Sequence, residues 1–260
     1  MEQEYINSLG DELHQAWFSR EAVAPLTDRF PTISIADAYQ IQQRMIGHRV
    51  AAGERHVGKK IGLTARVVQQ ALGVDQPDFG HLLSGMSHVD GASIPIASFI
   101  QPKAEGEMGF VLKRDLLGPG LTNADTLAAI ECVMPCFEIV DSRVVDWRIK
   151  VQDTIADNGS SGAFVVGDRA ADPRKLDLST LGMVLEKNGE IIGTGAGAAT
   201  LGNPLNALTW LANALGEYGI PLKAGELILS GSLSIMFPVA AGDVLRMSLG
   251  GVGSASCRFI

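Results

Sequence analysis

The first sixty residues carry apolar side chains at helical spacing. In the stretch INSLGDELHQAWFSREAV the apolar positions lie three or four residues apart, which predicts a helix with one buried stripe formed by Ile6, Leu9, Leu13 and Trp17. A second helix is predicted to begin at the capping-box-like segment from Ser34 to Asp37 and to run to Gly53. The chain is therefore expected to be mainly helical over residues 1–60.

The remainder of the chain shows short runs of apolar and β-branched residues with turn-forming residues between them, which is typical of strands. Asn188 and Gly189 separate two such runs and predict a hairpin with a type I′ turn. Two helices are expected among the strands, over residues 123–134, ended by Pro135, and over residues 203–219.

No linker, low-complexity segment or internal repeat divides the chain. We therefore expect one α+β catalytic unit over residues 1–260, in which the helical part packs on a β-rich core over residues 61–260. No window approaches the ~18 uninterrupted apolar residues that a membrane span needs. The acidic opening MEQE does not resemble a secretory signal. The sequence predicts a soluble, cytoplasmic protein without a membrane partner.

The formal net charge of -8 argues against nucleic acid as a partner, because Lys and Arg dominate contacts with phosphates. An anionic substrate would need cations gathered locally. The cysteines, Cys132, Cys136 and Cys257, lack CxxC spacing and predict neither a disulfide framework nor a zinc ribbon. We expect them to be small buried residues in a reducing compartment.

Two carboxylates, Glu105 and Glu107, lie one residue apart in the run QPKAEGEMGFVLK. In a strand their side chains point to the same face and repel each other. A solvated strand face would explain this pattern alone. Glu138 changes the picture, because it stands in the apolar stretch PCFEIVDSR, where an unpaired carboxylate is rarely tolerated. Three carboxylates without His or Cys form the oxygen ligand set that Mg²⁺ or Mn²⁺ takes, with Asp141 as a rival third ligand.

Further segments offer polar groups to a substrate. In GKKIGLT, Lys59 and Lys60 face opposite sides of a strand, so one points inward as a cation, unless both are surface lysines. In QPDFG, Asp78 is expected at the apex of a turn, with His81 directly after it as a pocket candidate.

The segment ADNGSSG consists of ordinary loop formers, but its backbone N–H groups and the hydroxyls of Ser160 and Ser161 also suit a carboxylate. Other motifs fail. GTGAGAATLG lacks the lysine of a phosphate loop and the third glycine of GxGxxG, and no GxSxG, HExxH or Cys/His pairing occurs.

The chain resembles the 2-hydroxypenta-2,4-dienoate (2-oxopent-4-enoate) hydratases of aromatic meta-cleavage pathways, which belong to the fumarylacetoacetate-hydrolase-like superfamily. The resemblance extends over nearly the whole chain and rests on segments taken together and in order: GKKIGLT, GVDQPDFG, QPKAEGE, PCFEIVDSR, DTIADNGSSG, EKNGEIIGTGAGAATLGNP and ELILSGSL. It implies a mixed β-sheet roll with flanking helices.

Carried over position by position, the resemblance implies three ligands for Mg²⁺ or Mn²⁺: Glu105, Glu107 and Glu138. The resemblance therefore favours Glu138 over Asp141 as the third ligand. It matches the motif lysine to Lys60, the acidic group of the PDFG segment to Asp78 and the serine of ADNxS to Ser160.

The chain departs from its relatives in one loop. Close relatives read ADNAS followed by Cys and Gly, whereas this chain has Gly159 and Ser161. The shape of this loop is therefore the part of the site that the resemblance predicts least.

The implied reaction adds water to 2-hydroxypenta-2,4-dienoate and gives 4-hydroxy-2-oxopentanoate. A proton moves from the enol to C5, and water then adds at C4, while a Lewis acid stabilises negative charge on the C2 oxygen. We expect Asp78 to transfer the proton and Lys60 to stabilise the enolate or assist. The resemblance also implies a homo-oligomer and association with 4-oxalocrotonate decarboxylase.

Three alternatives compete with this interpretation. The first is 4-oxalocrotonate decarboxylase itself, in which an apolar residue is expected in place of Asp78. The second is a C–C hydrolase of the acylpyruvate type, which would need a suitably placed His, and none is evident in the sequence. The third is a subunit that mainly stabilises the decarboxylase.

Overall fold

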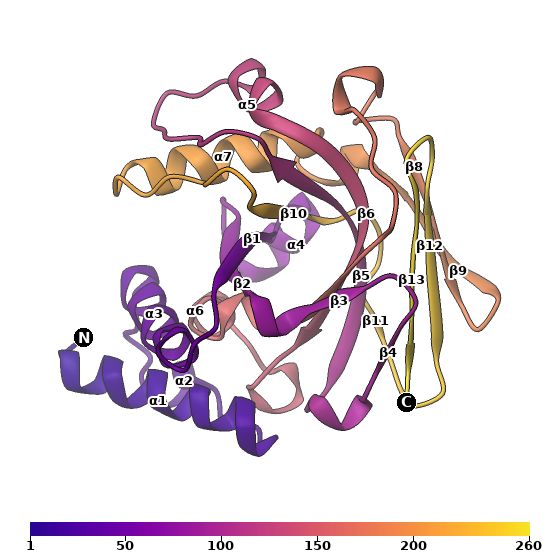
Figure 1. The fold of residues 1–260 in the computed structure, drawn as a ribbon. Coiled ribbons are helices and arrows are strands. Elements are labelled where there is room, and N and C mark those ends of the chain that lie inside the picture. Colours follow the sequence, from indigo (N-terminus) through magenta and orange to yellow (C-terminus); the bar gives the residue numbers. More distant parts are fainter.

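Two curled sheets pack against each other, and the helices lie against the larger sheet (Figure 1). This description rests on a computed structural model of residues 1–260, the side chains of Ala71 and Leu72 excepted. Helices and strands are mixed along the chain, and both sheets are curled. The predicted α+β class with a mixed β-sheet roll is therefore confirmed.

The larger sheet is built from β1 (His56–Gly62), β2 (Asp78–Leu83), β3 (Ser87–Val89), β5 (Pro102–Leu112), β6 (Ile130–Asp141), β7 (Ser161–Val166), β10 (Leu227–Ser232) and β11 (Phe237–Pro238). Its strand order is β2-β1-β10-β5-β6-β7-β3, and β11 pairs with β5. Strands β5 and β6 pair antiparallel along almost their whole length. This long pair lies in the middle of the sheet.

The smaller sheet is built from β4 (Ala92–Ile94), β8 (Gly182–Lys187), β9 (Glu190–Ala196), β12 (Val244–Leu249) and β13 (Gly253–Phe259). Its order is β4-β13-β12-β8-β9. Phe110 and Phe137 from the larger sheet pack with Leu185 and Met247 from the smaller one, so one apolar core fills the space between the sheets.

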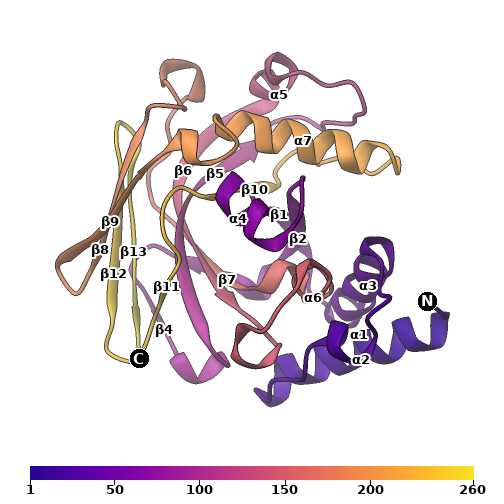
Figure 2. The same ribbon diagram turned by 180° about the vertical axis from the view of Figure 1, so that it is seen from behind.

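The helices are α1 (Gln3–Ser19), α2 (Leu26–Arg29), α3 (Ile35–Ala51), α4 (Arg66–Leu72), α5 (Asn123–Ala129), α6 (Val151–Ala156) and α7 (Pro204–Gly216). A second core joins α1 and α3 to the other side of the larger sheet, where Leu13 and Ile41 pack with Leu82 and Phe164. Figure 2 shows α1 and α3 beside α6, on the side of the molecule away from the smaller sheet. The larger sheet is thus covered on both faces.

Several local predictions are confirmed. Helix α3 begins after Ser34, whose hydroxyl accepts the Asp37 N–H at 3.1 Å while the Asp37 carboxylate accepts the Ser34 N–H at 3.0 Å. Strands β8 and β9 form the predicted hairpin, with φ of 56° at Asn188 and 84° at Gly189. Asn203 caps α7 by accepting the N–H of Leu205 at 2.9 Å.

The helix expected over residues 123–134 is wrong in its second half. Helix α5 ends at Ala129, and residues from Ile130 onward belong to β6. Val133 and Met134 lie opposite Phe110 and Gly109 of β5, so long-range strand pairing overrides the helical spacing of this segment. The first strand also starts at His56, inside the segment expected to be helical.

In the described part of the chain, no helix has both the length and the apolar character needed to cross a membrane. Cys136 and Cys257 are buried, Cys132 is half-buried, and all three are free thiols.

Candidate active site

The register of β5 and β6 brings the three predicted metal ligands together. Glu105 lies directly opposite Glu138, and Glu107 lies opposite Cys136. Between the two glutamates, Gly106 faces the smaller sheet so closely that an added Cβ would lie 2.7 Å from side-chain atoms of Leu185 and Met183. Because side chains alternate along a strand, both glutamates project away from the smaller sheet.

Carboxylate oxygens of Glu105, Glu107 and Glu138 lie within 4.8 Å of one another. Glu107 and Glu138 are completely buried. Glu107 Oε2 accepts the N–H of Gly231 at 2.8 Å, whereas Glu107 Oε1 and Glu138 Oε1 find no hydrogen-bond donor among the described residues. Buried oxygens without donors are costly. The three side chains therefore form an oxygen donor set that suits a hard divalent cation.

Charge in this cluster is not balanced by the protein alone. Burial, followed by the neighbouring Glu138 carboxylate, raises the pKa of Glu105 to about 7. The same two causes, with Glu105 added, raise the pKa of Glu107 well above its ordinary value. A bound cation would remove this repulsion and return both groups to the ionised form.

Lys60 is the inward lysine of β1, while Lys59 projects to the opposite side of the strand. Both are buried, so the alternative of two surface lysines is wrong. Lys59 donates to the Glu226 carboxylate at 3.0 and 3.1 Å. Lys60 Nζ donates to the carbonyl of Gly159 at 3.0 Å and lies 3.3 Å from Glu138 Oε2. Burial opposes its charge, but Glu138 and the carboxylates around it raise the pKa of Lys60 above its ordinary value.

Asp78 is the first residue of β2 rather than the apex of a turn, which corrects that expectation. It lies opposite Gly62 of β1. A Cβ added to Gly62 would lie 2.1 Å from Asp78 Oδ1 and 3.3 Å from Lys60 Nζ, so the two charged groups share the space that this glycine leaves free. Asp78 Oδ1 has no hydrogen-bond partner in the described part of the structure. Burial raises the pKa of Asp78, and Lys60 opposes this rise.

The loop after α6 is wound in the left-handed region. Asn158, Gly159 and Ser160 have φ values of 57°, 59° and 53°. Such a run is strained for non-glycine residues and needs support from its surroundings. The Asn158 side chain supplies it, because its Oδ1 accepts the N–H of His81 at 2.7 Å and its Nδ2 donates to the His81 carbonyl at 2.9 Å.

The buried Arg143–Asp157 ion pair holds the start of the same loop. Ser160 Oγ donates to Asp157 Oδ2 at 3.2 Å, so the pair also orients the serine hydroxyl. Asp141, the rival metal ligand, accepts the N–H groups of Ile100 and Gln101 instead. Sequence reasoning did not predict the roles of Asn158 and Arg143. The ADN segment itself was the available signal for Asn158.

A cavity of about 710 Å³ opens above these groups. Its polar lining comes from Lys60, Asp78, Glu105, Thr154 and Ser160, together with the serines after Gly231. Its apolar lining includes side chains from two separate elements: Val67 and Val68 of α4, and Ile235 and Met236 after β10. The cavity therefore has a charged inner part and an apolar part, and the side chains of the apolar part are exposed to solvent.

Two predicted site residues do not line this cavity. The Ser161 hydroxyl is fully buried and has no hydrogen-bond partner among the described residues. His81 lies on the side of β2 away from Asp78 and packs edge-on against His56, with ring centroids 4.9 Å apart. Neither side chain is brought to the carboxylate cluster.

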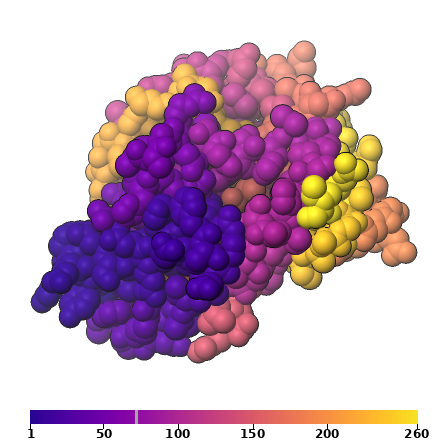
Figure 3. Space-filling model, turned by 60° about the horizontal axis from the view of Figure 1, so that its bottom comes forward, coloured from indigo at the N-terminus to yellow at the C-terminus, as the bar shows by residue number. Residues whose placement is uncertain are grey.

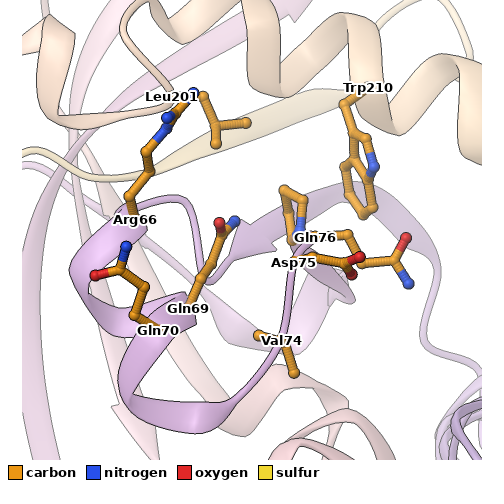
Figure 4. A pocket seen from close by; sticks show the side chains of 9 residues that line it. Arg66, Gln69, Gln70, Val74, Asp75, Gln76, Leu201 and Trp210 are labelled. Carbon is orange, nitrogen blue, oxygen red and sulfur yellow. The ribbon is translucent and has the colours of Figure 1, made fainter.

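A smaller cavity of about 500 Å³ lies on the other side of α4 (Figure 4). Arg66, Gln69 and Gln70 from α4 and the segment from Val74 to Pro77 line it, with Trp210 of α7 across from them. None of the predicted site residues contributes to this lining, so the chemistry is concentrated in the larger cavity.

Comparison with known proteins adds an independent observation. A family model described as fumarylacetoacetate (FAA) hydrolase C-terminal matches residues 56–260. The chain is 59% identical over 221 residues to a 2-hydroxypent-2,4-dienoate hydratase of Pseudomonas putida, which covers 85% of this chain and 100% of that protein. It is 51% identical over 260 residues to a 2-hydroxyhexa-2,4-dienoate hydratase of Comamonas testosteroni, with 99% and 98% covered.

A solved structure resembles the whole chain. The 4-oxalocrotonate decarboxylase from Pseudomonas putida G7, complexed with magnesium and adipate, superposes with a TM-score of 0.97 at 38% sequence identity. The match covers 100% of this chain and 99% of the decarboxylase chain.

Proposed function

The chain belongs to the fumarylacetoacetate hydrolase family, and we propose that it is a metal-dependent hydratase that adds water to 2-hydroxypenta-2,4-dienoate. The product would be 4-hydroxy-2-oxopentanoate. The observation that carries the proposal is the meeting of Asp78, Lys60 and the three-carboxylate cluster in one buried space. High identity to two hydratases over most of the chain supports the same reaction.

Glu105, Glu107 and Glu138 would hold the cation, which we propose to be Mg²⁺ or Mn²⁺. Their unpartnered oxygens and the absence of His or Cys from the cluster fit such an ion. When bound, a divalent cation supplies a Lewis acid for the substrate oxygens. The magnesium in the decarboxylase structure supports a hard cation in this family.

Lys60 would bind the anionic head of the substrate and stabilise negative charge as it develops on the C2 oxygen. Its ammonium is held by Gly159 and Glu138, so it is oriented before the substrate arrives. Ser160 lines the cavity, and its hydroxyl would turn from Asp157 to donate to the substrate carboxylate.

Asp78 would carry the proton. Its unpartnered oxygen shares the space beside Lys60, and its raised pKa favours a carboxyl that both holds and releases a proton. In the first step the enol loses its O–H proton and C5 gains one, which leaves an α,β-unsaturated ketone. In the second step water loses a proton as its oxygen bonds to C4, and C3 gains a proton.

The apolar part of the cavity supports a hydratase over the decarboxylase alternative. The decarboxylase substrate carries a second carboxylate, which would need a cation at its far end. Among the described residues that line the cavity, Lys60 is the only cation, and the head that both substrates share would already engage it. The ammonium of Lys103 lies outside this lining, 4.2 Å from the centroid of the Trp147 ring. The apolar mouth instead suits an uncharged C5 end.

One assay tests the proposed reaction. Purified protein is given freshly generated 2-hydroxypenta-2,4-dienoate and, separately, 2-oxohex-3-enedioate, with Mg²⁺ or Mn²⁺ and again after EDTA. We expect only the first compound to be consumed, and only with metal. Consumption of the second compound alone, with release of CO₂, would identify a decarboxylase and refute the proposal.

Two neighbouring serines provide a matched pair of variants. Ser160→Ala is expected to raise KM roughly tenfold, because a hydrogen bond to a charged group contributes about 1.5–3 kcal/mol. Ser161→Ala removes a buried hydroxyl without a partner among the described residues. It is expected to leave KM unchanged and to raise the free energy of unfolding by about 1 kcal/mol. Steady-state kinetics and urea unfolding measure both effects, and equal changes in KM would contradict the assignment.

A further inference from the structure

The N-terminal helical segment, residues 1–55, lies outside the part of the chain that matches the family model. The residues proposed to act on substrate or metal all lie beyond it, from Lys60 onward. Figure 3 shows this segment, in indigo, as a mass on one side of the molecule. Its buried polar side chains nevertheless reach two parts of the active site.

Gln42 of α3 makes the most direct of these contacts. Its side chain is completely buried, and its Nε2 donates to the carbonyl of Phe79 at 3.0 Å and to the carbonyl of Ile155 at 2.7 Å. Phe79 follows Asp78 in β2, and Ile155 lies in α6, just before the left-handed loop that holds Gly159. One amide group therefore bonds to two neighbouring segments of the site, β2 and α6.

The position of Gln42 is otherwise apolar. Its neighbours on the buried face of α3 include Ala38, Ile41 and Met45. The amide Oε1 has no hydrogen-bond partner in the described part of the chain, which is a cost that an apolar side chain would avoid. Since both nearby acceptors are carbonyls, the NH₂ group must face them. The gain from a glutamine here is thus confined to the two donated hydrogen bonds.

Other residues of the N-terminal helical segment also contact β2 and α6. The Tyr39 ring stacks on the Phe79 ring with centroids 4.5 Å apart. Thr27 donates through its N–H and its hydroxyl to the buried Asp153 carboxylate, at 3.0 and 2.7 Å, where α6 begins. Helices α3 and α6 lie side by side in both views (Figures 1 and 2).

We propose that Gln42 is a positioning residue, whose amide acts together with Asn158 to set the separation between the strand that carries Asp78 and the loop that carries Gly159 and Ser160. Through the Gly159 carbonyl it also acts on the orientation of Lys60. The kinetic part of this inference rests on the proposed hydratase function. The structural part does not, because it concerns how two segments are held.

Gln42→Met tests the proposal, since Met fills a similar volume and donates no hydrogen bond. We expect kcat to fall about 10- to 100-fold, because small displacements of reacting groups have effects of this size. KM is expected to rise as well, because the displaced loop carries Ser160 and contacts Lys60. The Kd for Mn²⁺ is expected to change little, because the three carboxylates lie on β5 and β6. Hydrogen exchange followed by mass spectrometry is expected to accelerate in peptides covering residues 78–83 and 155–161, and to stay unchanged in β12 and β13.

Ile41→Val, one residue away on the same helix and in the same core, is the matched control. It is expected to lower stability without the fall in kcat or the local rise in exchange. An unchanged kcat in Gln42→Met would overturn the proposal, as would equal losses in both variants. If the wild-type protein does not hydrate 2-hydroxypenta-2,4-dienoate, the proposed function fails and the exchange data alone test the positioning role. Unchanged exchange in the two peptides would then overturn that role.

Discussion

Replacing Glu107 by Gln is expected to abolish tight binding of Mn²⁺ while the fold is retained. Glu107 is fully buried, and its carboxylate is one of three that lie within 4.8 Å of one another. Gln has the same shape but cannot carry the negative charge. Even partners outside the ligand set contribute about 10- to 100-fold to metal affinity. We therefore expect Kd to rise more than about 100-fold, measured by calorimetric titration of EDTA-treated protein, and hydratase activity to be lost with it.

The same substitution is expected to stabilise the metal-free protein, and more so at pH 8 than at pH 6. The folded-state pKa of Glu105, about 7, lies above its ordinary value of 4.5, and that of Glu107 is raised as well. The stability that such groups contribute is complete below about pH 4.5 and is lost as the pH rises through about 7. At pH 8 the cluster is therefore charged and costly.

Glu107→Gln removes a carboxyl whose folded-state pKa is raised, so the free energy of unfolding in EDTA should rise by on the order of 1 kcal/mol or more. For the wild-type protein, the increase in Tm on adding Mn²⁺ should likewise be larger at pH 8 than at pH 6. Thermal unfolding at the two pH values, with Mn²⁺ and with EDTA, measures both trends.

Asp141→Asn is the matched control, because it makes the same carboxylate-to-amide change on the strand that carries Glu138. Asp141 accepts backbone N–H groups from Ile100 and Gln101 and lies outside the carboxylate cluster. Its variant should bind Mn²⁺ with unchanged affinity. An unaltered titration for Glu107→Gln, or a lost one for Asp141→Asn, would show that the ligand set is wrong.

The carboxylate cluster was predictable because most of its signals are local. The spacing of Glu105 and Glu107 defines one strand face, and Glu138 is conspicuous as a charge inside an apolar run. The spacing of these residues does not predict the pairing of β5 with β6, which places Glu105 opposite Glu138. The family resemblance supplied that link.

The supporting residues were harder to predict because their partners are distant in sequence. Gln42 binds carbonyls 37 and 113 residues away, and Asn158 binds a strand 77 residues away. The sequence offered one signal for Gln42, a polar residue beside Ile41 and Met45 on the buried face of a helix. That signal shows that a polar partner is needed but does not identify it.

Asp78 shows how a residue that does line the candidate site can be given the wrong local structure. Its neighbours Gln76 and Pro77 favour a turn, and Gly80 weakens the strand pattern that follows. Pairing with β1 makes Asp78 the first residue of a strand and directs it toward the space beside Lys60. The tertiary contact, rather than the turn chemistry, determines where the carboxyl lies.

Asp78→Asn is expected to lower kcat by about 10²- to 10⁴-fold, the usual contribution of a positioned proton-transfer group, and to leave the affinity for Mn²⁺ unchanged. The amide fills the same space beside Gly62 but cannot exchange a proton with the substrate. Reaction in D₂O provides a second readout. In the wild-type protein solvent deuterium should enter the C5 methyl group of the product, and in the variant the rate of this incorporation should fall together with kcat.

Asp75→Asn is the control for Asp78→Asn, since Asp75 is exposed and lines the smaller cavity. It should leave both kcat and deuterium incorporation unchanged. Lys60→Met separates the two proposed roles. Loss of the ammonium should raise KM and lower kcat together, because Lys60 is proposed both to bind the substrate head and to stabilise the developing charge. If Asp78→Asn keeps its kcat while Lys60→Met loses deuterium incorporation, Lys60 carries the proton and Asp78 serves only to keep that lysine charged.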